Sequence, residues 1–335
     1  MNLGRWMGVV IALVVASIVL AYLSLKRWTH LTGSTMGTTY QIHFEHNGYV
    51  GLSGLERDIE VLLQSINQEL STWNKDSWIS EFNNSAVGVE VAVPDHVWKV
   101  LQCSLVIAEA SGGAFNPASL GLTELWGFGA QKIEVRDLPS LATIQETVRQ
   151  SDIGNLSLNE ANQSLKKLSS GLQMDTSALT KGYAVDQIAA ILERSDLQNF
   201  SIEIGGEVRV SGKDPNDRAW EVRLQVPVGY PHSAPVVVLD QQSIATSGGG
   251  QNYIQIEDAL YTHIIDPRTG YPITRDQSLF SVSVISPACM ISDALATACF
   301  VLGVEGSEVL MREFPNCEVR FILHERTPSH LVRNR

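Results

Sequence analysis

The feature that most constrains this 335-residue chain is an apolar run close to its N-terminus. From Trp6 to Leu25 nearly every residue is apolar, and basic residues flank the run on both sides. A helix rises ~1.5 Å per residue, so about 20 residues cross the ~30 Å hydrocarbon core of a bilayer. We therefore expect residues 1–30 to be a membrane anchor with one transmembrane helix, and residues 31–335 to be a separate globular part.

A cleaved signal peptide is the alternative for this N-terminal segment. The run is long for the apolar region of a signal peptide, and no clear small-x-small cleavage motif precedes a polar boundary, so an uncleaved anchor is preferred. No cysteine follows the run at which a lipid could be attached. Because basic residues stand on both sides, charge decides the orientation of the anchor poorly.

The globular part is acidic. The whole chain has a formal net charge of −12, and its first thirty residues contain three basic side chains and no acidic one. The remainder is therefore more negative than the whole, and such a surface repels nucleic acid and anionic lipid. We expect no nucleic-acid partner. With 44% apolar residues, the chain can bury a substantial core.

The four cysteines give no sign of a metal site. They form no CxxC pair and have no histidines at the spacing of a zinc site. Cys103 and Cys299 lie in apolar helical patterns and are expected to be buried. If the domain lies outside the cytoplasm, a disulfide between Cys289 and Cys317 is possible, and the sequence alone does not decide whether it forms.

The periodicity of apolar residues divides the globular part into a helix-rich first half and a strand-rich second half. Helices are predicted at Leu55–Leu70, Asp95–Ala110, Leu138–Arg149, Lys181–Arg194, Ile291–Leu302 and Ser307–Phe314. Strands are predicted at Thr39–Glu45, Ser201–Val210, Trp220–Val226, Val236–Leu239, Tyr253–Ile256, Tyr261–Ile265, Leu279–Ile285 and Glu318–Leu323. No internal repeat or low-complexity linker interrupts them, so we expect one α+β catalytic domain with a mixed or antiparallel sheet and flanking helices.

The segment Met174–Asp186 places a carboxylate, hydroxyls and a lysine in the lead-in to a predicted helix. Free N–H groups and the positive end of the helix dipole favour a phosphate or another anion there. The alternative is that Asp175 or Thr176 only caps the helix and Lys181 is a solvated surface charge.

A second candidate motif lies on the helix predicted at Ile291–Leu302. Asp293 and Thr297 are four residues apart, so both oxygens lie on one face of an otherwise apolar helix. Mg²⁺ takes oxygen ligands and retains waters and substrate phosphates, so one carboxylate, a hydroxyl and a backbone carbonyl provide sufficient protein ligation. Taken alone, Asp293 could equally be a helix cap or a first-turn acid.

Two glycine clusters interrupt the strand-rich half, at Ile204–Gly206 and Thr246–Gly250. Glycine permits a positive φ and lets the backbone approach a bulky ligand closely. An ordinary bulge and an ordinary loop explain the two clusters equally well.

A histidine and several aromatic residues complete the candidate site. His263 lies at the end of a predicted strand, and its unperturbed pKa of ~6.5 suits a general base that activates a hydroxyl group. The segments Gly113–Pro117 and Trp126–Phe128 offer aromatic surface and kinked backbone for a flat ring system. Alternatively, these aromatic residues pack in the core, and His263 is a half-buried structural residue.

The order and spacing of these segments are more specific than any one of them. From Gly33 to the C-terminus, about nine tenths of the chain, the sequence resembles the ApbE-type FAD:protein FMN transferase family. The matching stretches are Gly33–Tyr40, Ala114–Pro117, Trp126–Gly129, Asp175–Asp186, Ile204–Glu207, Thr246–Gly248, His263–Pro272 and Asp293–Thr297.

The resemblance implies a set of site residues. The positions expected to contact FAD are Met36, Trp73, Ala114, Phe115, Asn116, Asp175, Lys181 and Ile264, and those expected to bind the metal are the Ala178 carbonyl, Asp293 and Thr297. His263 and Asp293 are the expected catalytic residues. Three departures from the family pattern are Trp73, where tyrosine is usual, Thr180, where alanine is common, and Gly249–Gly250, where an acidic and an aromatic residue are usual.

The function implied by the resemblance is Mg²⁺-dependent transfer of FMN from FAD to a threonine or serine hydroxyl of a partner protein, with release of AMP. Flavin-carrying subunits of membrane redox complexes are the implied acceptors, at the periplasmic face of the inner membrane. Two alternatives are an FAD diphosphatase that uses water, and a membrane-tethered flavin-binding module without catalysis. A flavoprotein oxidoreductase is disfavoured because no GxGxxG motif follows a strand.

Overall fold

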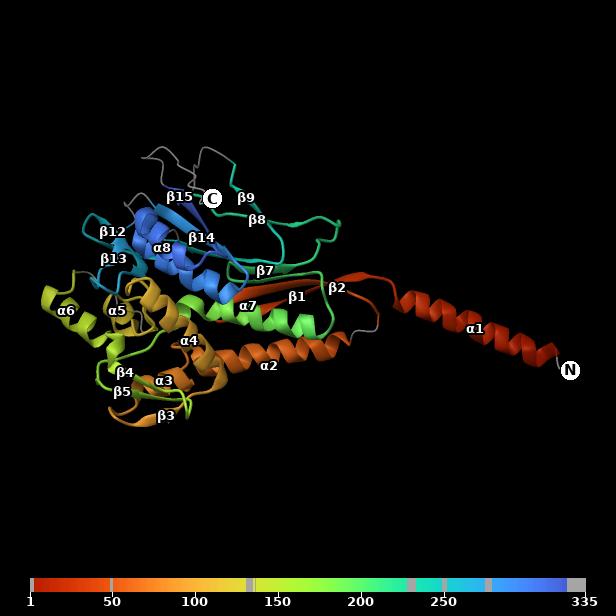
Figure 1. The fold of residues 1–335 in the computed structure, drawn as a ribbon, viewed down its shortest axis with the longest axis horizontal. Coiled ribbons are helices and arrows are strands. Elements are labelled where there is room, and N and C mark those ends of the chain that lie inside the picture. The colour runs from red at the N-terminus through yellow and green to blue at the C-terminus, as the bar shows by residue number, and fades with distance from the viewer. Residues whose placement is uncertain are drawn as a thin grey trace.

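A seven-stranded antiparallel sheet forms the centre of the protein, and helices cover one of its faces (Figure 1). The computed structural model describes residues 3–48, 51–130, 135, 137–227, 233–248, 252–274 and 279–323. Within these residues the strand pairings are antiparallel, and a long run of strands from Phe200 to Ser286 separates the helices of the first half of the chain from the last helix. The expected α+β class is confirmed.

The helices and strands have the following bounds. The α-helices are α1 Leu3–Leu23, α2 Leu52–Leu70, α3 Trp78–Asn84, α4 Asp95–Ala110, α5 Leu120–Leu125, α6 Leu141–Gln150, α7 Ser177–Arg194 and α8 Cys289–Leu310. The strands are β1 Arg27–Thr35, β2 Thr38–His46, β3 Glu90–Ala92, β4 Leu156–Asn159, β5 Ser164–Lys167, β6 Phe200–Ile204, β7 Glu207–Ser211, β8 Trp220–Arg223, β9 Val236–Leu239, β10 Ser243–Gly248, β11 Tyr253–Ile256, β12 Ala259–Ile265, β13 Pro272–Thr274, β14 Leu279–Ser286 and β15 Glu318–Leu323.

The central sheet has the strand order β1-β2-β6-β7-β10-β14-β15 and two differently covered faces. Apolar side chains of β2, β6 and β14 on one face pack with α2, α4, α7 and α8 in the main core. On the opposite face, a smaller cluster that includes Val208, Ile244 and Ile285 packs under residues of the two-stranded ribbon β8–β9. We call these the helical face and the outer face. Residues Ser281–Ser286 are buried without interruption because β14 is covered on both sides.

The predicted strand Ser201–Val210 is a hairpin. Gly205 and Gly206 have φ of +61° and +107° and form the turn between β6 and β7. A turn of two residues with positive φ matches the right-handed twist of the strands it joins. The glycine pair therefore reverses the chain here.

The two helices predicted at Ile291–Leu302 and Ser307–Phe314 form one kinked helix. α8 continues through Gly303, whose backbone is not helical at φ 67° and ψ −173°, to Leu310, and a short 3₁₀ turn follows. Glycine adopts this conformation without steric cost, so the chain bends there while both halves of α8 stay packed.

The N-terminal apolar run forms helix α1, which projects away from the globular body (Figure 1). The side chains of Trp6–Val19 are exposed, and this described apolar stretch is shorter than a full membrane span. Among the described side chains, the helix that is long and apolar enough to span a membrane is Cys289–Glu313, and it is packed in the core. The transmembrane role of residues 6–25 stays a prediction. Strand β1 of the central sheet begins at Arg27, so the sheet starts inside the segment 1–30 that was expected to be the anchor.

The four cysteines carry free thiols. Cys289 and Cys299 are buried, whereas Cys103 and Cys317 are partly buried. The disulfide that the sequence left undecided, between Cys289 and Cys317, is therefore absent from this structure. Burial raises the pKa of the Cys103 and Cys299 thiols to about 11, so they stay protonated and unreactive at neutral pH.

Candidate active site

One cleft of about 1570 Å³ brings together segments that are far apart in the sequence. The predicted site residues that line it are Trp73, Ala114, Phe115, Asn116, Asp175, Ala178, Lys181, His263, Ile264, Asp293 and Thr297. They come from the loop after α2, the loop before α5, helix α7 and the segment just before it, helix α8, and strand β12. The cleft exceeds the ~300–1,000 Å³ of ordinary small-molecule sites, so it has room for a large ligand.

Met36 is the predicted site residue that does not line this cleft. It lies in the β1–β2 turn, where Met36 and Gly37 both have positive φ, and it packs, half-buried, against the main core. Thr38, just after this turn, lies against Gly205, which does line the cleft. The turn is therefore near the cleft, and a contact between Met36 and FAD stays a prediction.

Asp293 is held at the crossing of α7 and α8. Its side chain is only 4% exposed, and its Oδ2 accepts a hydrogen bond of 3.0 Å from the Gly182 backbone N–H. In a regular α-helix that N–H bonds to the Ala178 carbonyl, so the Asp293 carboxylate lies beside the carbonyl predicted to bind the metal. Two predicted ligands that are 115 residues apart in the sequence therefore meet at one point.

The close approach of the two helices at this point requires a glycine. A Cβ at Gly182 would clash with the Cys289 carbonyl and lie 2.9 Å from Asp293 Cβ. Without that atom, the α7 backbone reaches the first turns of α8 directly. Gly182 thus brings the Asp293 carboxylate to α7.

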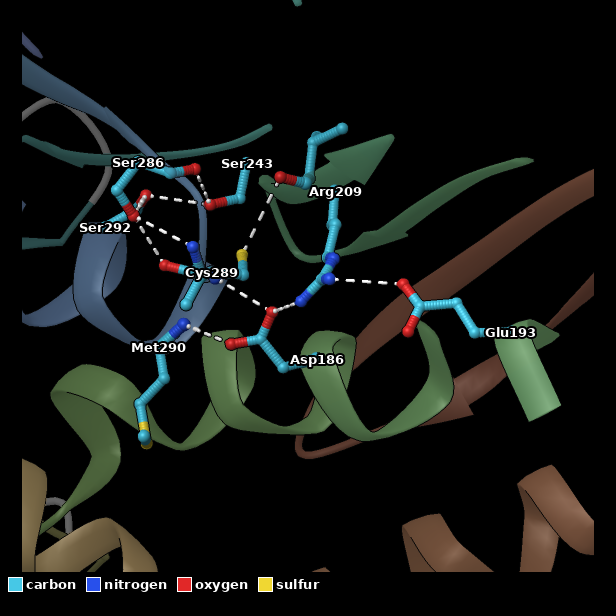
Figure 2. A network of polar contacts seen from close by, with 10 residues as sticks. Asp186, Glu193, Arg209, Ser243, Ser286, Cys289, Met290 and Ser292 are labelled. Atoms are coloured by element: carbon cyan, nitrogen blue, oxygen red, sulfur yellow. Dashed lines mark hydrogen bonds and ion pairs between the residues drawn. The ribbon is translucent and has the colours of Figure 1, made fainter. Parts of the chain in front are cut away.

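Asp186, one turn further along α7, fixes the start of α8 (Figure 2). Its carboxylate accepts 2.9 Å hydrogen bonds from the backbone N–H groups of Cys289 and Met290. Arg209 on β7 donates to the same carboxylate at 2.6 Å and also pairs with Glu193. These N–H groups have no partner within α8, so Asp186 acts as its N-terminal cap from a neighbouring helix.

We predict that Gly182→Ala destabilises the protein and impairs the site together. Overpacking of this kind costs about 1–3 kcal/mol of unfolding free energy, because α7 and α8 must move apart. Catalytic activity should fall with the displacement of Asp293. Urea unfolding and steady-state kinetics measure the two effects.

The control for that prediction is Gly54→Ala on α2, where a Cβ would meet no atom within 4 Å. Its stability should be unchanged or raised by up to about 1 kcal/mol, because alanine favours a helix more than glycine. Equal stability of the two variants would contradict the role assigned to Gly182.

Lys181 is paired with an acidic residue that the sequence did not single out. Its Nζ lies 2.8 Å from Glu207 Oε1, and Glu207 is 3% exposed at the start of β7. Desolvation and the Asp293 charge raise the pKa of Glu207, and Lys181 only partly opposes this. The negative charges of Asp293 and Glu207 raise the pKa of Lys181 despite its burial. Lys181 is therefore a fixed cation between two buried carboxylates.

The residues at this point fit a divalent cation. Burial raises the pKa of Asp293, and Lys181 alone opposes this with a full charge. Glu207 Oε2 is buried without a hydrogen-bond partner among the described residues. A hard cation with oxygen ligands would favour the ionised forms of these two carboxyl groups, whose pKa values burial raises beside a single lysine. No cluster of three His, Cys, Asp or Glu side chains occurs among the described residues, so neutral oxygens would complete the shell.

Thr297 supplies the second predicted side-chain ligand from α8. It lines the cleft one helical turn beyond Asp293, and its hydroxyl lies 3.0 Å from the Ser247 hydroxyl on β10. The spacing of four residues therefore places both oxygens on the cleft side of α8, as the sequence predicts. Ser247, within the predicted Thr246–Gly250 cluster, is an additional polar residue of the site.

His263 lies on β12 at the wall of the cleft. Its Nδ1 is 3.3 Å from the Asn252 carbonyl, and its ring meets Phe128 edge to face at 6.3 Å. Desolvation and the Lys181 charge lower the pKa of His263, although the Asn252 carbonyl opposes them. The imidazole is neutral at pH 7 and can accept a proton, as the sequence-based role requires.

The aromatic residues divide between the core and the cleft. Trp126 is fully buried, donates its indole N–H to the Gly270 carbonyl and stacks on Tyr261, so it belongs to the core. Trp73, which is 60% exposed, and Phe128 both line the cleft. Rings available for stacking on a flat ligand are therefore present at two places in the wall.

Asp175 and Asn116 are positioned by local backbone contacts. The Asp175 carboxylate accepts from the Ser177 N–H at 2.9 Å, and burial raises the pKa of this carboxyl. The amide of Asn116 donates to the Ser151 carbonyl and accepts from the Ala118 N–H. The N-cap residue of α7 is Thr176, whose side chain makes no capping bond, whereas Asp175 just before it bonds to the first N–H of the helix and also lines the cleft. The departure at Gly249–Gly250 lies outside the described residues.

Sequence reasoning missed Glu207 and Asp186 as residues that organise the site. Glu207 follows the glycine pair directly, so an acidic residue after a turn near a candidate site was the available signal. Asp186 ends the segment Met174–Asp186, but nothing local shows that it caps a helix 103 residues later. Long-range contacts of this kind need the folded chain.

Comparisons with known proteins show the family to which this chain belongs. The model of the ApbE family matches residues 36–321. The FAD:protein FMN transferase of Haemophilus influenzae is 32% identical over 311 residues, which cover 90% of this chain and 88% of the relative. The corresponding protein of Vibrio cholerae is 33% identical and covers 82% of each chain.

Solved structures show the same similarity in three dimensions. Flavin transferase ApbE from Vibrio cholerae superposes with a TM-score of 0.80 at 30% identity, covering 90% of this chain and 95% of the other. The apo form of Pseudomonas stutzeri flavinyl transferase ApbE superposes with a TM-score of 0.81 at 29% identity, covering 90% and 92%. The similarity therefore extends over nearly the whole globular part.

Proposed function

Since this chain belongs to the ApbE family, we propose that it is an FAD:protein FMN transferase that uses Mg²⁺ and a serine or threonine hydroxyl of the acceptor. One observation carries the proposal. Asp293 on α8 and the α7 segment that contains Ala178 and Lys181 meet in one cleft. This arrangement suits a pyrophosphate that is held between a lysine and a hard cation.

The reaction exchanges the phosphoanhydride bond of FAD for a phosphoester bond. The acceptor hydroxyl oxygen forms a bond to the phosphorus on the FMN side of the FAD pyrophosphate, and the bond from that phosphorus to the bridging oxygen breaks. AMP leaves with the bridging oxygen, and the hydroxyl proton passes to a base. The catalyst must position the pyrophosphate, balance its charge and remove that proton.

The residues of this chain divide these tasks. Lys181 lies in the cleft as a fixed cation and suits the FAD phosphates, while Glu207 holds its ammonium group in place. Asp293, Thr297 and the Ala178 carbonyl would hold Mg²⁺, which when bound supplies charge neutralisation at the pyrophosphate. His263 would receive the proton, and the exposed ring of Trp73 can stack on part of FAD.

The experiment that tests the proposal is incubation of the full chain with FAD, Mg²⁺ and a threonine-containing acceptor protein. Covalently fluorescent acceptor plus AMP identifies a transferase. Free FMN plus AMP without labelled protein identifies the diphosphatase alternative, and intact FAD identifies the binding module. Either of the last two results would overturn the proposal.

His263 provides a pH-dependent prediction. Protonation removes its capacity as a base, and its pKa is lowered, so the transfer rate should fall only below about pH 6.5, the unperturbed pKa. His263→Asn should lower kcat by roughly 10²–10⁴-fold and remove this inflection, with little change in the KM for FAD.

The control for that prediction is His30→Asn on β1, outside the residues that line the cleft. Its pH profile should match that of the unaltered protein. An unchanged profile in His263→Asn as well would exclude His263 as the base.

We further propose that α1 anchors the enzyme in the inner membrane with the catalytic domain in the periplasm. Its 21 residues correspond to about 30 Å of helix, and the exposed side chains of Trp6–Val19 are apolar apart from Ser17. The acceptors would then be flavin-carrying subunits of membrane redox complexes. Release of the protein by alkaline carbonate, or resistance to protease in spheroplasts, would contradict this placement.

A further inference from the structure

The cleft continues beyond the candidate metal site to the outer face of the central sheet. There it is lined by Ser201, Glu203 and Val208 of the sheet and by residues 221–226 of β8 and the loop after it. We call this part the outer arm. Lys181, Asp293 and Thr297 line the same cleft from the helical face. The two parts are connected next to the β6–β7 turn, whose glycines also line the cleft.

The connection is open because β7 pairs with only part of β10. Their register ends at Ile244 opposite Val208, whereas β10 pairs with β14 as far as Gly248. The Val210 N–H donates to the Gln242 carbonyl, so the backbone groups of Gln242 point towards β7. In an antiparallel ladder every second residue points to the same neighbouring strand. The backbone groups of Thr246 and Gly248 therefore also point to the side of β10 on which β7 lies. No described residue pairs with them there. Within the described part of the chain, residues 246–248 therefore form a free strand edge that faces the cleft.

A buried hydroxyl without a partner lies beside this edge. Ser281 on β14 is opposite Gly248, is 3% exposed and lines the cleft. Its Oγ has no hydrogen-bond partner among the described residues. A buried polar group that is left unpaired costs free energy, so a ligand able to pair with it gains affinity.

We propose that the free edge of β10 and the outer arm form the docking site of the acceptor polypeptide, whose hydroxyl-bearing segment adds as a strand along residues 246–248. This inference rests on the proposed function and specifies where its second substrate binds. Backbone groups of an extended segment pair with Thr246 and Gly248, and the Ser281 hydroxyl bonds to a polar group of the same segment.

The position of the edge brings an acceptor hydroxyl to the reaction site. An added strand lies about 4.8 Å from β10, and its side chains alternate between the two faces of the sheet. On β10 itself, Ser247 points to the helical face and reaches Thr297 at 3.0 Å. A serine or threonine of the added strand that points the same way lies beside the candidate metal ligands.

The charges of the outer arm favour a polypeptide over part of FAD. Glu203 and Glu221 line it, with Arg223 as the described basic residue among its lining side chains. Two carboxylates repel a pyrophosphate, which the lysine and the candidate cation site attract instead. The uncharged backbone of a polypeptide is not repelled by these carboxylates.

Two matched serine variants on β14 test the proposal in the full-length enzyme. The substrate in this test is the acceptor protein that becomes covalently fluorescent when it is incubated with the enzyme, FAD and Mg²⁺. Mass spectrometry identifies its modified segment. Ser281→Ala should raise the KM for this acceptor about three- to tenfold, the value of one hydrogen bond, and change the KM for FAD less than twofold. Stability should not fall, because the lost hydroxyl had no partner.

The control is Ser283→Ala, on the same strand and face, where the hydroxyl already bonds to Thr246 Oγ1 at 2.7 Å. Ser283 is 1% exposed and does not line the cleft. This variant should lose stability and keep its acceptor KM. An unchanged acceptor KM in Ser281→Ala, or equal changes in both variants, would overturn the proposal.

Hydrogen exchange provides the second measurement. The probe is the acceptor with its modified residue replaced by alanine, so that it binds without reacting. It should slow amide exchange in residues 243–248, and FAD alone should not. Protection only elsewhere, or the same protection by FAD, would reject the docking site while leaving the transferase assignment intact. Absence of any FMN attachment would instead overturn the proposed function and this inference with it.

Discussion

Asp293→Ala should lower FMN transfer by on the order of 10³-fold while the protein stays folded and still binds FAD. The carboxylate is the only charged side chain among the three proposed Mg²⁺ ligands, so its loss removes the strongest contact to the cation. FAD retains Lys181 and the aromatic wall of the cleft as binding partners. Single-turnover release of AMP measures the reaction, and flavin fluorescence measures binding.

Asp293→Asn separates the charge of this residue from its structural contact. Its side-chain oxygen can still accept the Gly182 N–H that joins α7 to α8, but it carries no negative charge. The asparagine variant should therefore unfold at nearly the same urea concentration as the unaltered protein and transfer FMN as poorly as the alanine variant. Transfer at the ordinary rate by either variant would exclude Asp293 as a metal ligand.

Lys181→Met should produce the largest loss of stability among the variants considered for the site. It removes the cation that Asp293 and Glu207 share and leaves two buried carboxylates without a charged partner. Removal of one partner from a buried ion pair costs about 3–5 kcal/mol. Transfer should also be lost, because the proposed phosphate contact is gone. Urea unfolding at pH 9, above the raised pKa of Glu207, measures the stability.

The pH dependence of Lys181→Met follows from the direction of the carboxyl pKa values. The pKa of Glu207 is already raised by burial and by Asp293, and removal of the lysine raises it further. Between the unfolded and folded pKa values, the folded state binds more protons, so the unfolding free energy falls as pH rises. The folded pKa of Glu207 is already about 8 in the unaltered protein, so both proteins keep this proton at lower pH. The additional loss in the variant should therefore grow as the pH rises past about 8, with a slope of up to about 1.4 kcal/mol per pH unit for each proton.

Lys167→Met is the matched control for the lysine prediction. Lys167 is 2% exposed, and its ammonium group donates to the Asn83 carbonyl. Its removal therefore leaves no unpaired carboxylate. The variant should show no additional loss of stability between pH 7 and pH 9. An equal pH slope in both lysine variants would contradict the shared-cation arrangement at Lys181.

Local patterns in the sequence located much of the structure because they depend on neighbouring residues. The predicted helix Asp95–Ala110 is identical to α4, and the helix predicted at Leu55–Leu70 differs from α2 only at its start. The spacing of Asp293 and Thr297 placed both on the cleft side of α8 for the same reason. Helical periodicity is a property of a few consecutive turns and needs no distant partner.

Glycines were harder to interpret from sequence than the helices. Gly205 and Gly206 reverse the chain, and Gly303 bends α8 without ending it. A glycine permits several backbone conformations, so the packing around it selects one. Gly182 has no special φ at all, and only the contact with α8 reveals why a side chain does not fit there.

By itself, the sequence determined which chemical groups are present: an apolar N-terminal helix, an acidic α+β domain, and oxygen, lysine and histidine side chains in a family-like order. Only the tertiary structure decided which of these groups meet. The pairing of Lys181 with Glu207, the cap of α8 by Asp186 and the free edge of β10 beside Ser281 all join residues from separate elements. Burial and pairing arise when those elements pack, and spacing along the chain does not encode them.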